Sequence, residues 1–130
     1  MSKLTEIENA LRQVDPAGFQ RLCDDYLSAR GYRDINPIGL VIGTDKVKRG
    51  TPDSLVTLPN GNYAFAEYTT QQTGVVKKFI EDMGKCFDAS KTGIPVDRIQ
   101  RFIACHTSVV DPADEHRLVE EGRKRGCLVT

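Results

Sequence analysis

Three features are missing from the sequence: a long apolar run, closely paired cysteines and an excess of charge of one sign. A transmembrane helix needs about 20 consecutive apolar residues, so the chain is not expected to span a membrane. The first residues, MSKLTEIENALRQV, lack the apolar stretch of a signal peptide. We therefore expect a cytoplasmic protein with reduced thiols.

The spacing of cysteine and histidine argues against a zinc site. There is no Cys-x-x-Cys pair, and the cysteines lie far apart, at positions 23, 86, 105 and 127. Most of them sit among apolar residues, where a buried thiol packs as a small apolar side chain. His106 and His116 fall on different predicted elements, without the spacing of zinc ligands. A Gly-rich phosphate loop, a nucleophile elbow and a His-Glu-x-x-His pattern are also missing.

The charge of the chain is balanced, with 18 basic and 18 acidic residues. A domain that grips nucleic acid unaided is usually strongly basic, because much of the affinity comes from phosphate contacts. Basic residues cluster within 45–49 and 117–125, but such runs more often form a solvated face. Any affinity for nucleic acid is therefore expected to need a parent protein or oligomerisation.

Length and composition indicate a single domain. The 130 residues, 39% of them hydrophobic and 28% charged, are enough to bury one hydrophobic core. The last residues, Cys127-Leu128-Val129-Thr130, resemble the first half of a strand. We therefore expect residues 1–130 to be one domain in the N-terminal part of a longer polypeptide.

The predicted elements follow the order α-β-β-β-α-β-α-β. Apolar residues recur at helical spacing, and Asp15-Pro16 and Asp111-Pro112 resemble N-caps with proline in the first turn. β-branched and aromatic residues favour strands elsewhere. Helices are predicted at 4–14, 16–30, 75–90 and 112–126, and strands at 40–48, 53–58, 63–70, 99–107 and from 127. This order predicts an α/β fold with a mixed central sheet flanked by helices.

The helix at 16–30 has a clear apolar face. Its predicted members are Phe19, Leu22, Cys23, Tyr26 and Leu27. Asp24 and Asp25 follow Cys23, and solvated side chains or local ion pairs explain them. We therefore assign these two aspartates no functional role.

A turn between the second and third strands sets their register. Leu58-Pro59-Asn60-Gly61 favours a three-residue hairpin loop, with a left-handed glycine at its end. Opposed residues then have numbers that sum to 120, so Asp53 faces Glu67. A two-residue Asn60-Gly61 loop is the alternative. It would pair Asp53 with Tyr68 and place the two carboxylates on opposite faces of the sheet.

Two opposed carboxylates need a reason to be there. Directly opposed residues have Cβ atoms about 4.5–5.5 Å apart, and like charges at that spacing destabilise a sheet. A divalent cation would offset the repulsion, and Mg²⁺ favours one or two carboxylates together with waters and phosphate oxygens. The alternative is a pair near a strand end that solvent or a neighbouring lysine relieves.

The hairpin resembles a known nuclease motif. Gly50-Thr51-Pro52-Asp53-Ser54-Leu55-Val56, followed by Phe65-Ala66-Glu67-Tyr68-Thr69-Thr70-Gln71, is similar to the PD-(D/E)xK pattern of restriction-endonuclease-like proteins. The order of elements also matches that family over nearly the whole chain. The likeness is greatest to Mrr-like nuclease domains at the N-termini of bacterial defence proteins.

The resemblance implies roles for three residues. Asp53 and Glu67 stand at the metal-binding positions of the motif, and the metal is expected to be Mg²⁺ or Mn²⁺. Thr69 stands where the family usually has lysine, whose ammonium helps to activate water and to steady the phosphate. Threonine offers only a hydroxyl, so Thr69 is expected to contact substrate without supplying charge.

Another residue is expected to replace the missing lysine. The candidates are Gln71 on the same strand face, Lys77 on the following helix, and Lys46 or Lys48 on the preceding strand. We favour Gln71 with help from Lys77, and we expect Lys46 and Lys48 to contact substrate. Surface residues without a role remain the alternative. Gln20 stands where Mrr-like relatives often have a helical glutamate that supports the metal, and it too is uncharged.

The resemblance implies a metal-dependent endonuclease that cuts double-stranded DNA as the effector domain of a bacterial antiviral defence protein. The chain itself does not distinguish DNA from RNA. The alternative is a module that kept the nuclease fold and lost its chemistry, and that now binds nucleic acid or drives oligomerisation.

Overall fold

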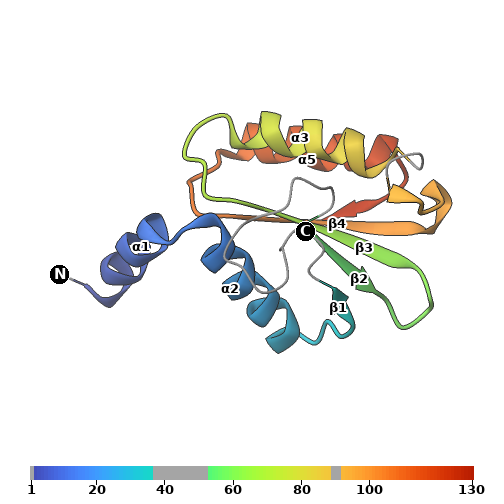
Figure 1. Ribbon diagram of the computed structural model, residues 1–130. Coiled ribbons are helices and arrows are strands. Elements are labelled where there is room, and N and C mark those ends of the chain that lie inside the picture. Colours follow the sequence, from blue (N-terminus) through green and yellow to red (C-terminus); the bar gives the residue numbers. More distant parts are fainter. Residues whose placement is uncertain (1, 37–52, 89–91) are drawn as a thin grey trace.

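The computed structural model describes residues 2–36, 53–88 and 92–130 (Figure 1). Its helices are α1 (Lys3–Gln13), α2 (Pro16–Ala29), α3 (Val75–Cys86) and α5 (Pro112–Lys124), with a short 3₁₀ helix at Val96–Arg98. Its strands are β1 (Ile35–Asn36), β2 (Ser54–Thr57), β3 (Tyr63–Thr69), β4 (Ile99–His106) and β5 (Leu128–Val129). The strand predicted at 40–48, with Lys46 and Lys48, lies outside the described residues.

The described strands form one mixed sheet in the order β1-β2-β3-β4-β5. The β1–β2 and β2–β3 pairs are antiparallel, whereas the β3–β4 and β4–β5 pairs are parallel. Helices α3 and α5 cover one face of the sheet and α2 covers the other (Figure 1). The predicted α/β class with a mixed, helix-flanked sheet is therefore confirmed. The short strand β1 was not predicted, because two residues carry too little pattern to be recognised.

The β2–β3 hairpin has the three-residue loop. Ser54 pairs with Ala66 and Thr57 with Tyr63, so paired residue numbers sum to 120. The Leu58 amide donates to the Asn62 carbonyl at 2.8 Å, and Gly61 has φ of 85°. This register confirms the prediction and rules out the two-residue loop.

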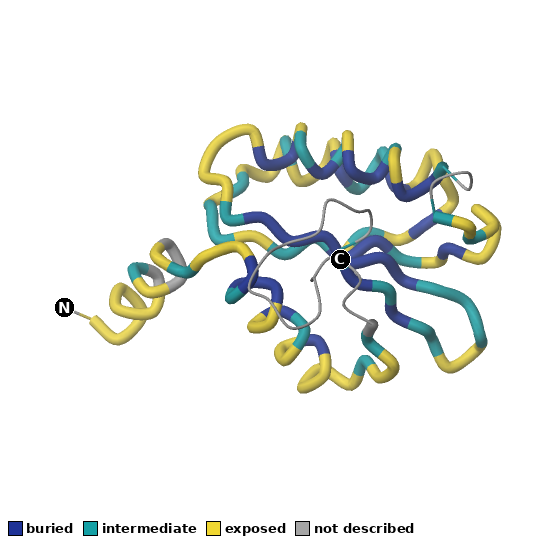
Figure 2. Tube along the Cα trace, viewed as in Figure 1, coloured by how far each residue is buried: buried dark blue, intermediate teal, exposed yellow. Residues whose placement is uncertain are grey.

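Each face of the sheet buries its own apolar cluster, and the buried positions lie along the strands and on the helices that cover them (Figure 2). On the α3 and α5 face the large members are Phe65, Phe79, Met83 and Phe102. On the α2 face they are Phe19, Leu27, Val56, Tyr68 and Ile103. Neighbouring residues of a strand point to opposite faces, so β3 contributes to both clusters. Burial of one such side chain stabilises the fold by about 1.5–3 kcal/mol.

The predicted helix starts are confirmed. Asp15 accepts from the Gly18 amide at 2.6 Å and Asp111 from the Asp114 amide at 2.9 Å, and a proline follows each cap. These contacts satisfy amides that have no partner within the helix. None of the described helices is both long and apolar enough to cross a membrane.

The buried face of α2 differs from the prediction. Leu22 and Tyr26 are 47% and 59% exposed, whereas Gln20 is only 2% exposed. The helix packs on the sheet along the stripe of Phe19, Cys23 and Leu27, which is flanked by Gln20. The apolar pattern of the sequence did not predict this rotation of α2. The side-chain amide of Gln20 can be buried because the sheet provides hydrogen-bond partners for it.

Candidate active site

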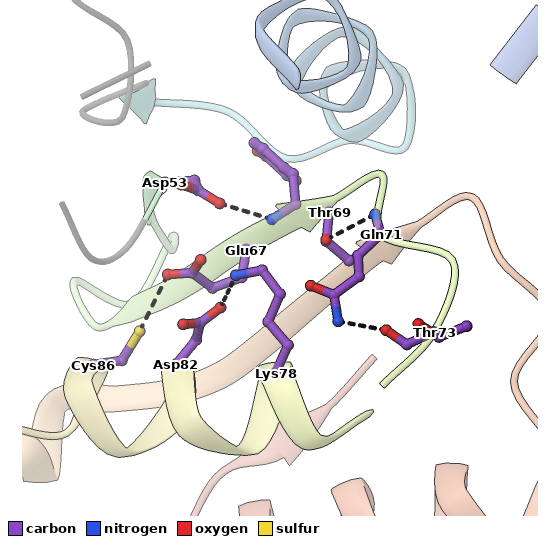
Figure 3. Close-up of polar contacts among 9 residues, drawn as sticks. Asp53, Glu67, Thr69, Gln71, Thr73, Lys78, Asp82 and Cys86 are labelled. Atoms are coloured by element: carbon purple, nitrogen blue, oxygen red, sulfur yellow. Dashed lines mark hydrogen bonds and ion pairs between the residues drawn. The ribbon is translucent and has the colours of Figure 1, made fainter. Parts of the chain in front are cut away.

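Asp53 and Glu67 come together on the face of the sheet that α3 covers (Figure 3). Asp53 immediately precedes β2, and Glu67 lies in β3 opposite it by the register of the hairpin. The Tyr68 amide donates to the Asp53 Oδ2 atom at 2.8 Å and so orients this carboxyl. The local cause is the Pro59-Asn60-Gly61 loop, which places the two residues opposite each other.

The two carboxyl groups share an environment that opposes their joint ionisation. Burial, the charge of Asp53 and a hydrogen bond to Asp53 raise the pKa of Glu67 to about 10. Burial likewise raises the pKa of Asp53, although its hydrogen bonds to Glu67 and to the Tyr68 amide act in the other direction. At neutral pH the pair therefore holds a proton where a cation could bind.

Helix α3 adds a lysine and a third carboxylate beside this pair. The Lys78 Nζ atom lies 2.7 Å from the Asp82 Oδ2 atom, one helical turn away (Figure 3). Burial lowers the pKa of Lys78, but the hydrogen bond to Asp82 and the charges of Glu67 and Asp53 outweigh it, so the pKa is raised. Lys78 therefore stays charged and faces the carboxylates.

Cys86 of α3 is buried next to Glu67. Its thiol donates to the Glu67 Oε1 atom at an Sγ to Oε1 distance of 3.6 Å. Burial first, and then the charge of Glu67, raise the pKa of Cys86. The group is therefore a neutral thiol and not a thiolate ligand. All four cysteines are free, and those at 23, 86 and 127 are buried, as predicted.

The structure does not turn Gln71 toward the carboxylates. Its side-chain amide donates to the Thr73 carbonyl, within its own loop (Figure 3). Its main-chain amide donates to the Thr69 hydroxyl at 3.1 Å. The Thr69 hydroxyl therefore stabilises the loop after β3, although Thr69 lies on the same strand as Glu67.

Lys77 also lies apart from the pair. It is exposed, and it lines a depression near the start of α3 together with Val109, Asp114 and Arg117. Lys78 is the lysine of this helix that faces the site, and sequence reasoning missed it. The spacing of Lys78, Asp82 and Cys86, four residues apart on one stripe of an amphipathic helix, was the signal that could have identified it.

A second polar cluster lies on the opposite face of the sheet, under α2. Gln20 donates through Nε2 to the main-chain carbonyl of Asp53 at 2.9 Å. Asp24 accepts from the Ser54 hydroxyl at 2.9 Å and from the Tyr68 hydroxyl. Solvation or a local ion pair was expected to explain Asp24, but its hydrogen bonds reach the sheet instead, because the rotation of α2 brings it there.

The donor set suits a hard divalent cation. Asp53 and Glu67 can offer carboxylate oxygens to such an ion, whereas Asp82 is paired with Lys78 at 2.7 Å. Within 2–36, 53–88 and 92–130, no three or more His, Cys, Asp or Glu side chains are grouped as metal ligands. Mg²⁺ needs no such group, since one or two carboxylates and several waters commonly hold it.

Models of known protein families give no match to the chain, and neither curated proteins nor solved structures match it.

Proposed function

We propose that the chain is a metal-dependent endonuclease that hydrolyses phosphodiester bonds of nucleic acid. The observation that carries the proposal is the opposed pair of buried Glu67 and half-buried Asp53, with Lys78 beside it. A mixed sheet with this hairpin is compatible with the restriction-endonuclease-like fold that the Pro52-Asp53 and Glu67 motif implies. The fold alone does not assign the chemistry, so the argument rests on the side chains.

Asp53 and Glu67 would hold Mg²⁺ or Mn²⁺ between them. The bound ion would polarise the phosphodiester and lower the pKa of a water that attacks phosphorus. Glu67 would release its proton on binding, because the positive charge replaces the proton that burial and Asp53 now favour. The hydrogen bond from the Tyr68 amide would hold the Asp53 carboxylate in place as a ligand of the same ion.

Lys78 supplies the positive charge that Thr69 cannot. Its ammonium is held by Asp82 at 2.7 Å, and it interacts with both Glu67 and Asp53. A cation in this position can stabilise charge on the phosphate in the transition state. We therefore place Lys78, rather than Gln71 or Lys77, in the role of the motif lysine.

The substrate that the resemblance implies is double-stranded DNA, and the implied setting is the effector domain of a bacterial antiviral defence protein. The neutral overall charge supports a chain that depends on a partner or on oligomerisation for affinity. The competing proposal is a nuclease-fold module that binds without cutting. The ion pair between Lys78 and Asp82 favours it, because that pair occupies the ammonium.

Cleavage of supercoiled plasmid and of an RNA duplex in the presence of Mg²⁺ or Mn²⁺ tests the proposal. We expect the wild-type chain to nick or linearise the plasmid, and Asp53→Asn and Glu67→Gln to abolish the reaction. Chelation with EDTA should do the same. Binding to DNA without cleavage, at all metal concentrations, would favour the inactive module. Equal cleavage by wild type and Asp53→Asn would refute the proposed site.

A further inference from the structure

The residues that follow the two candidate ligands lie on the other face of the sheet. Ser54 follows Asp53 and Tyr68 follows Glu67, so the alternation of a strand turns both away from the site. Both are buried, at 0% and 8% exposure. Any group that holds Ser54 and Tyr68 therefore also sets the positions of Asp53 and Glu67.

Asp24 on α2 holds both of them. Its Oδ1 atom accepts from the Ser54 hydroxyl at 2.9 Å and from the Tyr68 hydroxyl. One carboxylate oxygen of α2 thus connects β2 and β3 by hydrogen bonds on the α2 face of the sheet. Burial raises the pKa of Asp24, but hydrogen bonds from Tyr68 and Ser54 favour its charged form.

These hydrogen bonds lie at the end of the ladder between β2 and β3. The paired residues of β2 begin at Ser54, so Asp53 lies just outside the ladder. Its carbonyl is held instead by Gln20, which is one turn before Asp24 on the same helix. Its side chain is held by the Tyr68 amide. Helix α2 therefore fixes this end of the hairpin through Gln20 and Asp24 together.

We propose that Asp24 is a positioning residue, which sets the separation of Asp53 and Glu67 from the opposite face of the sheet. The proposal rests on the proposed function for its consequence in metal binding, but its geometric part does not. The contacts of Asp24 with the hairpin are hydrogen bonds from residues on the face of the sheet opposite the two candidate ligands. It acts through Ser54 and Tyr68.

The test compares two substitutions. Asp24→Leu is similar in size and removes the carboxylate that accepts both hydrogen bonds, whereas Asp24→Asn keeps one acceptor oxygen. Asp25→Asn is the matched control, because Asp25 is the exposed neighbour on the same helix. Calorimetry of Mn²⁺ binding should show a loss of affinity of about 10- to 100-fold in Asp24→Leu, the scale of losing a residue that supports a metal ligand. Asp24→Asn and Asp25→Asn should stay near wild type. Plasmid cleavage should follow the affinity and recover at high Mn²⁺.

A second measurement does not need the metal. Amide hydrogen exchange of the metal-free protein should be faster at Tyr68 in Asp24→Leu, because the Tyr68 amide donates to the Asp53 carboxyl. Tyr68→Phe and Ser54→Ala each remove one donor and should give smaller effects in the same direction. If Asp24→Leu does not fold, amide exchange in these two variants tests the positioning role instead.

The outcomes separate the two proposals. Unchanged exchange of the residue 68 amide in Asp24→Leu, or in both single-donor variants, would overturn the positioning role. So would Mn²⁺ affinity equal to wild type in a folded Asp24→Leu protein. If the wild-type chain binds no Mn²⁺ and cuts nothing, the proposed function fails. Faster exchange at Tyr68 would then still support the positioning of Asp53 by Asp24.

Discussion

Glu67 lies opposite Asp53 at the end of the β2–β3 hairpin, so the buried carboxyl group of Glu67 and the half-buried one of Asp53 share one environment. Such a pair is unfavourable when both groups are charged, which makes it sensitive to protons and to cations.

Stability of the metal-free protein should fall as pH rises. The pKa of Glu67 is about 10 in the folded chain, against 4.5 as its ordinary value. Between these values the unfolded chain is ionised and the folded chain is protonated. The stabilisation is therefore complete below the lower value, and it is lost as pH rises toward the upper one, by at most about 1.4 kcal/mol per pH unit.

Urea unfolding from pH 5 to pH 9 in EDTA measures this dependence. Glu67→Gln keeps the shape and cannot ionise, so its free energy of unfolding should vary less with pH than that of wild type. Parallel curves for the two proteins would contradict the raised pKa. Glu81→Gln, an exposed glutamate on α3, is the control and should follow wild type.

Divalent cations should stabilise the folded protein, and more so at higher pH. A ligand at 100 times its dissociation constant adds about 2.7 kcal/mol when it binds the folded state alone. Mg²⁺ competes with a proton at Glu67, so the rise in Tm on adding Mg²⁺ should be greater at pH 8.5 than at pH 6.5. Differential scanning fluorimetry measures it. A rise of equal size in Glu67→Gln would show that the ion binds elsewhere.

Lys78→Ala should slow cleavage by about 100-fold, the scale of losing one well-placed stabilising group. Lys77→Ala is the matched control at the preceding position of the helix, and it should leave the rate unchanged because Lys77 is exposed and lines another depression. Because Asp82 is buried and loses its partner in this variant, thermal unfolding must show that Lys78→Ala is folded before the rates are compared. Rates measured at saturating Mn²⁺ decide between the two lysines. The reverse result would favour Lys77 as the source of the positive charge.

Gly61→Val should destabilise the chain by about 1–2 kcal/mol, because Gly61 has φ of 85°, where side chains with a Cβ branch are strained. Gly61→Asn should cost less, since asparagine tolerates this backbone region. Thermal unfolding measures both. Equal Tm values for Gly61→Val and wild type would contradict the turn that sets Asp53 opposite Glu67.

Local rules were sufficient for much of the fold. The caps at Asp15 and Asp111, the hairpin loop and the opposition of Asp53 and Glu67 depend on residues near one another in sequence, where proline, glycine and alternation have direct physical consequences. The helix and strand order follows from the same short-range patterns. The strand predicted at 40–48 lies outside the described residues.

The sequence by itself determined the class of fold and the candidate metal pair, because a three-residue turn sets the register of its hairpin. Only the tertiary structure decided what surrounds that pair. The choice of Lys78 over Lys77 depends on how α3 is rotated on the sheet, and the role of Asp24 depends on the rotation of α2. These rotations follow from packing between segments distant in the chain, so no local pattern contains them.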